Sequence, residues 1–176
     1  MLNDGILLST LLNTMGTRGW IVLVVQGKLI VMYNHYDSYP EWLGKNLTEE
    51  IKELYEKYGR DVLCQMILDL KIINSASPKP TAEEVELLLP YCSSLLTGRK
   101  ITNWDWYCLL RECQGSLSKT LESGYALTET ADSLSDCKPD LLIEYVYILN
   151  FDDNTFKCNG HNYGSLDNIQ EKWYEL

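Results

Sequence analysis

Two apolar runs near the N-terminus constrain the fold of this chain more than any other feature. Residues 20–25 and 29–33 are rich in β-branched side chains and flank a short segment that contains Gly27. Two such runs about a glycine-containing turn predict a β-hairpin. Every residue in both runs is apolar or aromatic, rather than every second one, which favours a sheet that is covered on both faces.

Helical patterns follow this hairpin and fill the middle of the chain. Apolar residues recur at helical spacing, Asn46 with Glu49 has a box-like capping pattern, and Gly59 is a natural stop. Thr81 and Glu84 form a clear capping box for a further short helix. The predicted helices are 46–59, 61–73, 81–89 and 103–115, with one or two more turns at 117–121.

A second hairpin is predicted near the C-terminus, with strands at 143–149 and 156–158, after a polar surface loop at 128–139. A short helix at 165–173 closes the chain. The fold class is therefore α+β: an antiparallel sheet built from the N- and C-terminal hairpins, with the helical middle packed on it. The length fits a single domain over 1–176, in which residues 1–14 form a leader helix or extension.

The charge balance limits the partners of the chain. Asp and Glu total 25 against 15 Lys and Arg, which gives a net charge of -10. An acidic surface repels nucleic-acid phosphates and anionic membranes, so no direct nucleic-acid or membrane binding is expected. The negative charge either keeps the protein in solution or attracts a basic protein partner.

The six cysteines include no C-x-x-C pair, and the chain has only two histidines. No metal site and no cofactor are therefore predicted. The expected state is six free thiols in a reducing cytoplasm, which would be the host cytoplasm if the protein is viral. Cys64 and Cys108 lie in apolar helical stretches and are expected to be buried.

Two motifs carry a resemblance to a known family. The chain reads Met-Gly-Thr-Arg-Gly at 15–19 and Tyr-Asn-His-x-Asp-Ser-Tyr-Pro-x-x-Leu-Gly at 33–44. These motifs, with the pattern at 145–156, resemble a family of small viral, bacterial and fungal proteins. Its members open with Met-Cys-Thr-Arg-Gly or Met-Gly-Thr-Arg-Gly before a hairpin. The family brings no established activity.

A weaker similarity concerns the N-terminal nucleophile hydrolases, in which a nucleophilic first residue opens a β-hairpin. The chain departs from that pattern because Gly16 occupies the position of the cysteine and fifteen residues precede it. Thr17 would serve as the nucleophile only after cleavage between Gly16 and Thr17. The similarity implies an amidohydrolase, intact or decayed, and leaves the question of catalysis open.

His35 and Asp37 are further catalytic candidates, because a histidine beside a carboxylate is the start of an acid–base pair. An extended backbone would place both side chains on one face. The alternative is structural: Asn34, Asp37 and Ser38 would bond the local backbone of a tight turn. Thr17 and Arg18 complete the set of four catalytic candidates. Arg18 would pair with Asp37 or with Glu41.

Aromatic side chains provide the candidate binding residues. The 12 tyrosines suit half-buried surfaces and interfaces. At 104–108, helical spacing predicts that Trp104, Tyr107 and Cys108 face the core, which leaves Trp106 on the other side as an interface candidate. The predicted binding residues are Tyr33, Asn34, His35, Tyr36, Tyr39, Trp42 and Trp106.

Three functional hypotheses remain open. The first is a non-catalytic binding or regulatory module, of viral origin in one version, that acts through protein–protein contacts. The second is an amidohydrolase of the N-terminal nucleophile type. The third is an acidic inhibitor that occupies the nucleic-acid groove of a host or defence protein.

Overall fold

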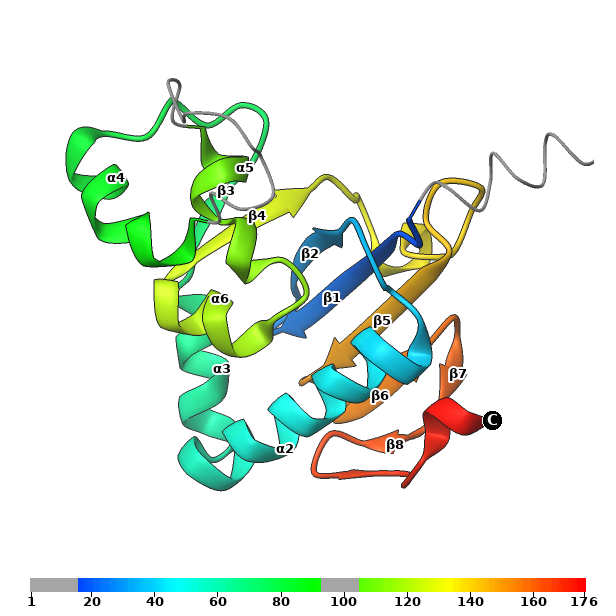
Figure 1. The fold of residues 1–176 in the computed structure, drawn as a ribbon. Helices are drawn as coiled ribbons and strands as arrows, with labels where there is room; N and C mark the ends of the chain where they lie inside the picture. The colour runs from blue at the N-terminus through cyan, green and yellow to red at the C-terminus, as the bar shows by residue number, and fades with distance from the viewer. Residues whose placement is uncertain (1–15, 93–104) are drawn as a thin grey trace, which may run out of the picture.

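A mixed β-sheet with helices on one side forms the centre of the protein (Figure 1). The computed structural model describes residues 16–92 and 105–176; the leader expected at 1–14 lies outside them. The seven-stranded sheet has the order β3-β4-β2-β1-β5-β6-β7, and β8 pairs with β9 separately. The strands are β1 Gly19–Val25, β2 Lys28–Asn34, β3 Lys71–Ile73, β4 Tyr125–Glu129, β5 Tyr145–Asn150, β6 Thr155–Cys158, β7 His161–Asn162, β8 Gly164–Ser165 and β9 Asn168–Ile169.

The α+β class and both hairpins are confirmed, but the prediction of an antiparallel sheet is wrong. β1 pairs with β2, and β5 with β6, in antiparallel hairpins. The hairpins join through β1 and β5, which run parallel with Gly19 opposite Tyr145. β3 and β4 are also parallel. A long helical connection between two hairpins lets the chain re-enter the sheet in either direction, and the hydrophobic pattern of a strand does not encode that direction.

The sheet is covered on both faces, as the uninterrupted apolar runs predict. Ile21 and Leu23 face the larger core with residues of α2 (Lys45–Tyr58), α3 (Arg60–Leu68) and α6 (Leu117–Ser123). Val22 and Val24 point to the other face and pack with residues between 131 and 148. The polar segment at 128–139 is therefore not only a surface loop. It begins in β4 and contributes buried Cys137 to the second face.

Helix boundaries follow local signals in part. The stop at Gly59, with φ of 73°, and the Thr81–Glu84 capping box of α4 (Ala82–Leu88) are confirmed. Asn46 is not a cap, because α2 continues directly from a π-helical turn, η1 (Pro40–Gly44). The remaining helical segments are η2 Leu89–Tyr91, α5 Trp106–Leu109, η3 Arg111–Cys113, η4 Leu134–Asp136 and η5 Trp173–Glu175.

Two segments that were predicted to be helical contain short strands in the structure. The segment 61–73 leaves the helix after Leu68, and Lys71–Ile73 becomes β3 because it pairs with β4. The predicted helix at 165–173 is a short strand pair followed by η5. In both cases a run of a few apolar residues fits a helix turn or a short strand equally well, so a partner strand decides.

All six cysteines are free, as expected, but their burial differs from the prediction. Cys64 and Cys108 are only half-buried. Neighbouring Leu63 and Leu109 take the inward positions of their helices and turn the thiols to the side. The buried thiols are Cys113, Cys137 and Cys158.

Candidate functional site

The 33–44 segment forms a tight turn at the end of β2. Asn34 is buried, and its side-chain amide donates hydrogen bonds to the carbonyl of Tyr36 and, at 2.9 Å, to Oγ of Ser38. Asp37 has a φ of 52°, in the left-handed region that Asp tolerates better than most residues. The structural interpretation is thereby confirmed for Asn34, which bonds the local backbone, whereas the Ser38 hydroxyl bonds the Asn34 side chain instead. Asp37 contributes its backbone conformation, since its side chain forms no hydrogen bond within 16–92 and 105–176.

The described part of the first motif, residues 16–19, lies against this turn. The backbone N–H of Ser38 donates to the carbonyl of Thr17 at 3.3 Å. A Cβ at Gly16 would come within 2.5 Å of the Tyr36 ring, and one at Gly19 within 2.8 Å of Cβ of Ser38. The close approach of the turn requires glycine at Gly19, where the neighbouring atoms include a backbone carbonyl, whereas a side chain at position 16 would require the exposed Tyr36 ring to move. The two motifs that carry the family resemblance are therefore neighbours in space.

The candidate catalytic residues do not form an acid–base pair. Nδ1 of His35 shares a hydrogen bond of 2.6 Å with the hydroxyl of Tyr33, whereas the positive φ of Asp37 breaks the extended backbone that would align it with His35. Burial lowers the pKa of His35, and the positive charges of Arg18 and Arg111 lower it further. The lowered pKa favours the neutral form of His35.

The other two catalytic candidates, Thr17 and Arg18, lie in the segment that leads into β1. Thr17 is only 4% exposed, which shields its hydroxyl from a substrate. Arg18 forms no ion pair with Asp37 or Glu41 in the described part of the chain. Its backbone carbonyl instead accepts hydrogen bonds from Glu144 and Tyr145, and its charge acts on Tyr33 and His35.

A distant segment, residues 105–116, completes the site and was missed by the sequence analysis. The guanidinium of Arg111 lies 5.5 Å from the ring centroids of both Tyr36 and Tyr107, and it donates to the side-chain carbonyl of Gln114. The only sequence signal for this contact is Gly115, whose φ is 75°. A Cβ there would lie 2.9 Å from Oδ1 of Asn34.

A cavity of about 190 Å³ opens beside these residues. Its apolar wall comes from β1, β2, β4 and the residue that follows α5. Its polar residues are two tyrosines, Gln114, the α6 cap Ser116, Thr120 within α6, and Glu129. The full lining is Ile21, Met32, Tyr33, Tyr107, Leu110, Cys113, Gln114, Gly115, Ser116, Thr120, Leu127 and Glu129.

Four aromatic side chains of the 33–44 and 105–116 segments are exposed to solvent. Trp42 is 63% exposed, Tyr36 49%, Tyr39 46% and Tyr107 42%. Tyr36 and Tyr107 are joined through Arg111, and Tyr39 packs edge-on against Tyr145 with the ring centroids 6.2 Å apart. We call Tyr36, Tyr39, Trp42 and Tyr107 the aromatic surface.

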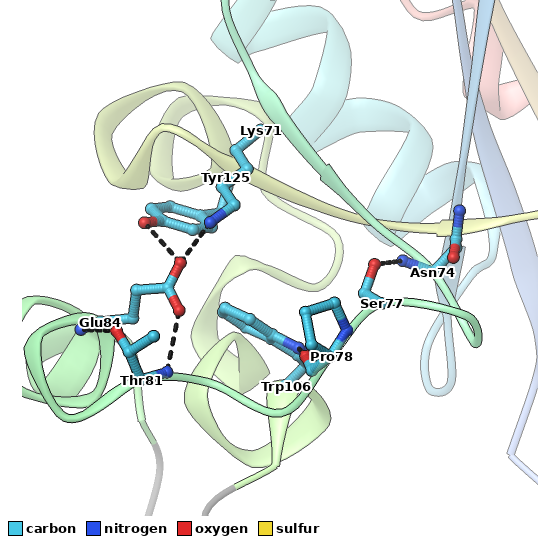
Figure 2. Close-up of polar contacts among 8 residues, drawn as sticks. All are labelled: Lys71, Asn74, Ser77, Pro78, Thr81, Glu84, Trp106 and Tyr125. Carbon is cyan, nitrogen blue, oxygen red and sulfur yellow. Dashed lines mark hydrogen bonds and ion pairs between the residues drawn. The ribbon is translucent and has the colours of Figure 1, made fainter.

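Trp106, predicted as an interface residue, is buried, and Tyr107, predicted for the core, is exposed. The helix begins only at Trp106, where Asp105 caps it by accepting from the N–H of Cys108 at 2.7 Å. Because the helix starts at Trp106 rather than at residue 103, its buried face differs from the predicted one. Trp104 lies outside the described residues. The Trp106 indole N–H donates to the carbonyl of Pro78 at 2.7 Å (Figure 2).

The surroundings of Trp106 are structural. Its ring stacks on that of Tyr125, with the ring centroids 5.8 Å apart. The Glu84 carboxylate accepts hydrogen bonds from Lys71, from the Tyr125 hydroxyl and from the Thr81 N–H (Figure 2). The ion pair with Lys71 lowers the pKa of Glu84. These contacts fix α4 and α5 to β3 and β4.

No protein-family model, curated protein or solved structure matches this chain. The family resemblance and the assignment of binding residues stay predictions. Across 16–92 and 105–176, no group of three or more His, Cys, Asp or Glu side chains is placed to hold a metal ion. Over the same residues, no helix has the length and apolar character needed to cross a membrane.

Proposed function

We propose that this chain is a non-catalytic binding module that recognises a protein partner through the aromatic surface. The supporting observation is the exposure of these four aromatic side chains, of which Tyr36 and Tyr107 pack on Arg111. Tyr, Trp and Arg are the residue types that contribute most of the binding energy in protein interfaces. The hydrolase alternative has less support, because Gly16 carries no nucleophile and Thr17 is buried.

The partner surface that fits best is basic. Asp37 and Glu41 are exposed in the same segment as the aromatic surface, and Glu144 is exposed beside Tyr145. With the net charge of -10, we expect these carboxylates to act as an acidic rim beside the aromatic side chains. Such a rim attracts a basic partner and speeds its association, while the aromatic side chains supply most of the affinity.

The test is binding of a host protein that is captured on the purified chain, then purified and titrated directly. The double variant Y39A/W42A should weaken binding by about tenfold or more, because two exposed hot-spot side chains are lost. L87A, at another exposed apolar position on α4, is the matched control and should bind like the wild type. Full affinity of the double variant, or the absence of any directly binding partner, would contradict the proposal.

A charge variant separates this proposal from the groove-inhibitor alternative. E41Q should slow association and reduce its salt dependence while it leaves dissociation nearly unchanged, since a rim charge acts mainly on encounter. An inhibitor that imitates nucleic-acid phosphates would instead lose most of its affinity with its carboxylates and little with Tyr39 and Trp42.

A further inference from the structure

We propose that the cavity between β2, β4 and the 107–116 segment binds an α-amino acid with an apolar side chain, held as a zwitterion. The inference goes beyond the protein-binding function, because it concerns a small molecule and a cavity rather than the aromatic surface. It rests on three observations: the cavity has an apolar wall of limited size, Arg111 contacts the lining residues Tyr107 and Gln114, and Glu129 is itself a lining residue.

The apolar wall suits the side chain of a single small ligand. Ile21, Met32 and Leu110 are almost fully buried and line the cavity together with Leu127. The volume of about 190 Å³ is below the roughly 300–1,000 Å³ of sites for drug-sized ligands. Burial of a leucine-sized side chain against this wall would provide the non-directional part of the affinity.

The arginines provide the site for a carboxylate. Arg111 is held in place by the rings of Tyr36 and Tyr107 and by its hydrogen bond to Gln114, which itself lines the cavity. It has no ion pair with a carboxylate within the described ranges. A guanidinium fixed in this way offers its remaining N–H groups to a carboxylate in a bidentate geometry. Arg18 adds a second positive charge close to Tyr33.

Glu129 provides the site for an ammonium group. This residue lines the same cavity, and its carboxylate forms no hydrogen bond or ion pair with any described residue. A ligand with only a carboxylate would be repelled by Glu129, and a ligand with only an ammonium would be repelled by Arg18 and Arg111. A zwitterion places each charge beside a group of opposite sign. Tyr33 and Tyr107 also line the cavity, and the Tyr33 hydroxyl shares a hydrogen bond with Nδ1 of His35.

The experiment compares four probes by NMR, with the methyl signals of Met32, Leu110 and Leu127 as reporters. L-Leucine should give saturable shifts at millimolar concentration. N-acetyl-L-leucine lacks the ammonium, L-leucinamide lacks the carboxylate and glycine lacks the apolar side chain. Each should bind about tenfold or more weakly, because one charge-assisted contact or the apolar burial is lost. No saturable shift with leucine, or equal binding of any one of the other probes, would overturn the inference.

Variants assign the two charges. R111Q should weaken leucine binding about tenfold or more, and R111K, which keeps the charge but not the planar fork, should weaken it less. E129Q should remove the preference for leucine over N-acetyl-L-leucine. E122Q, an exposed carboxylate on α6 outside the cavity lining, is the matched control and should keep that preference. An E129Q variant that keeps the preference would overturn the role of the carboxylate.

The variants of Tyr39 and Trp42 keep this test separate from the function proposed above. Y39A/W42A should bind leucine like the wild type, because neither side chain lines the cavity. Loss of leucine binding in that variant would overturn the assignment of the ligand to the cavity. A failure of leucine to bind the wild type would leave the partner titration unaffected.

Discussion

The hydroxyl of Tyr147 donates a 2.7 Å hydrogen bond to the carbonyl of Ser38, which lies 109 residues earlier in the chain. Tyr147 is fully buried in β5, and Ser38 is fully buried in the turn beside Thr17. This bond fixes the 33–44 segment to the second hairpin. It therefore connects the candidate site directly to the parallel β1–β5 junction that neither hairpin encodes.

The Y147F variant should be destabilised by about 1–3 kcal/mol, because the buried Ser38 carbonyl loses its donor. For a chain of this size the Tm should fall by roughly 2–4 °C per kcal/mol. Y145F is the control, since Tyr145 is only partly buried and its ring still stacks on that of Tyr147. Thermal unfolding of both variants measures the difference, and an unchanged Tm for Y147F would contradict the role of the bond.

Substitutions at Asp37 should report backbone conformation rather than lost side-chain contacts. D37A should cost about 1 kcal/mol, because alanine disfavours a φ of 52°. D37N should be close to neutral, and D37G should be neutral or stabilising, since both residues tolerate the left-handed region. Urea denaturation distinguishes this order. Equal destabilisation by all three changes would show that the carboxylate itself is required.

Trp106 and Tyr107 form a matched pair for burial. W106A should destabilise the fold by about 3–5 kcal/mol, because it removes a large buried ring and its hydrogen bond to Pro78. Y107A should cost much less, since its side chain is 42% exposed. Denaturant midpoints give both values, and the reverse order would restore the prediction that Tyr107 faces the core and Trp106 the surface.

His35 should make the protein less stable in mild acid. Its pKa in the folded state is lowered from 6.5, so the unfolded chain takes up the proton more readily. The stability contributed by neutral His35 is complete above pH 6.5 and is lost as the pH falls from 6.5 through the lower pKa of the folded state. Urea denaturation on both sides of pH 6.5 should show this decline in the wild type.

In H35Q the decline should be smaller than in the wild type. H161Q replaces the second histidine, which is exposed in β7, and should keep the wild-type decline. An H35Q variant with the same pH dependence as the wild type would contradict the neutral state of His35.

Some features of this fold depend on residues that are close in the sequence, and others depend on residues that are far apart. The sequence alone determined the two hairpins, the two-sided burial of β1 and β2, the stop at Gly59 and the Thr81–Glu84 capping box. Each depends on residues within a few positions of one another, so propensity, turn chemistry and side-chain periodicity are sufficient. The turn bonds of Asn34 and Ser38 belong to the same class.

Only the tertiary structure decided the direction of β5 against β1, the burial of Trp106 and the composition of the site. Arg111, Tyr107 and Glu129 reach the 33–44 segment from positions at least 60 residues later in the sequence. No local pattern specifies such contacts, because they arise from the packing of elements whose own preferences are already satisfied. Asn34 illustrates the division: its turn can be inferred from its neighbours, whereas its contact with Gly115 exists only in the folded chain.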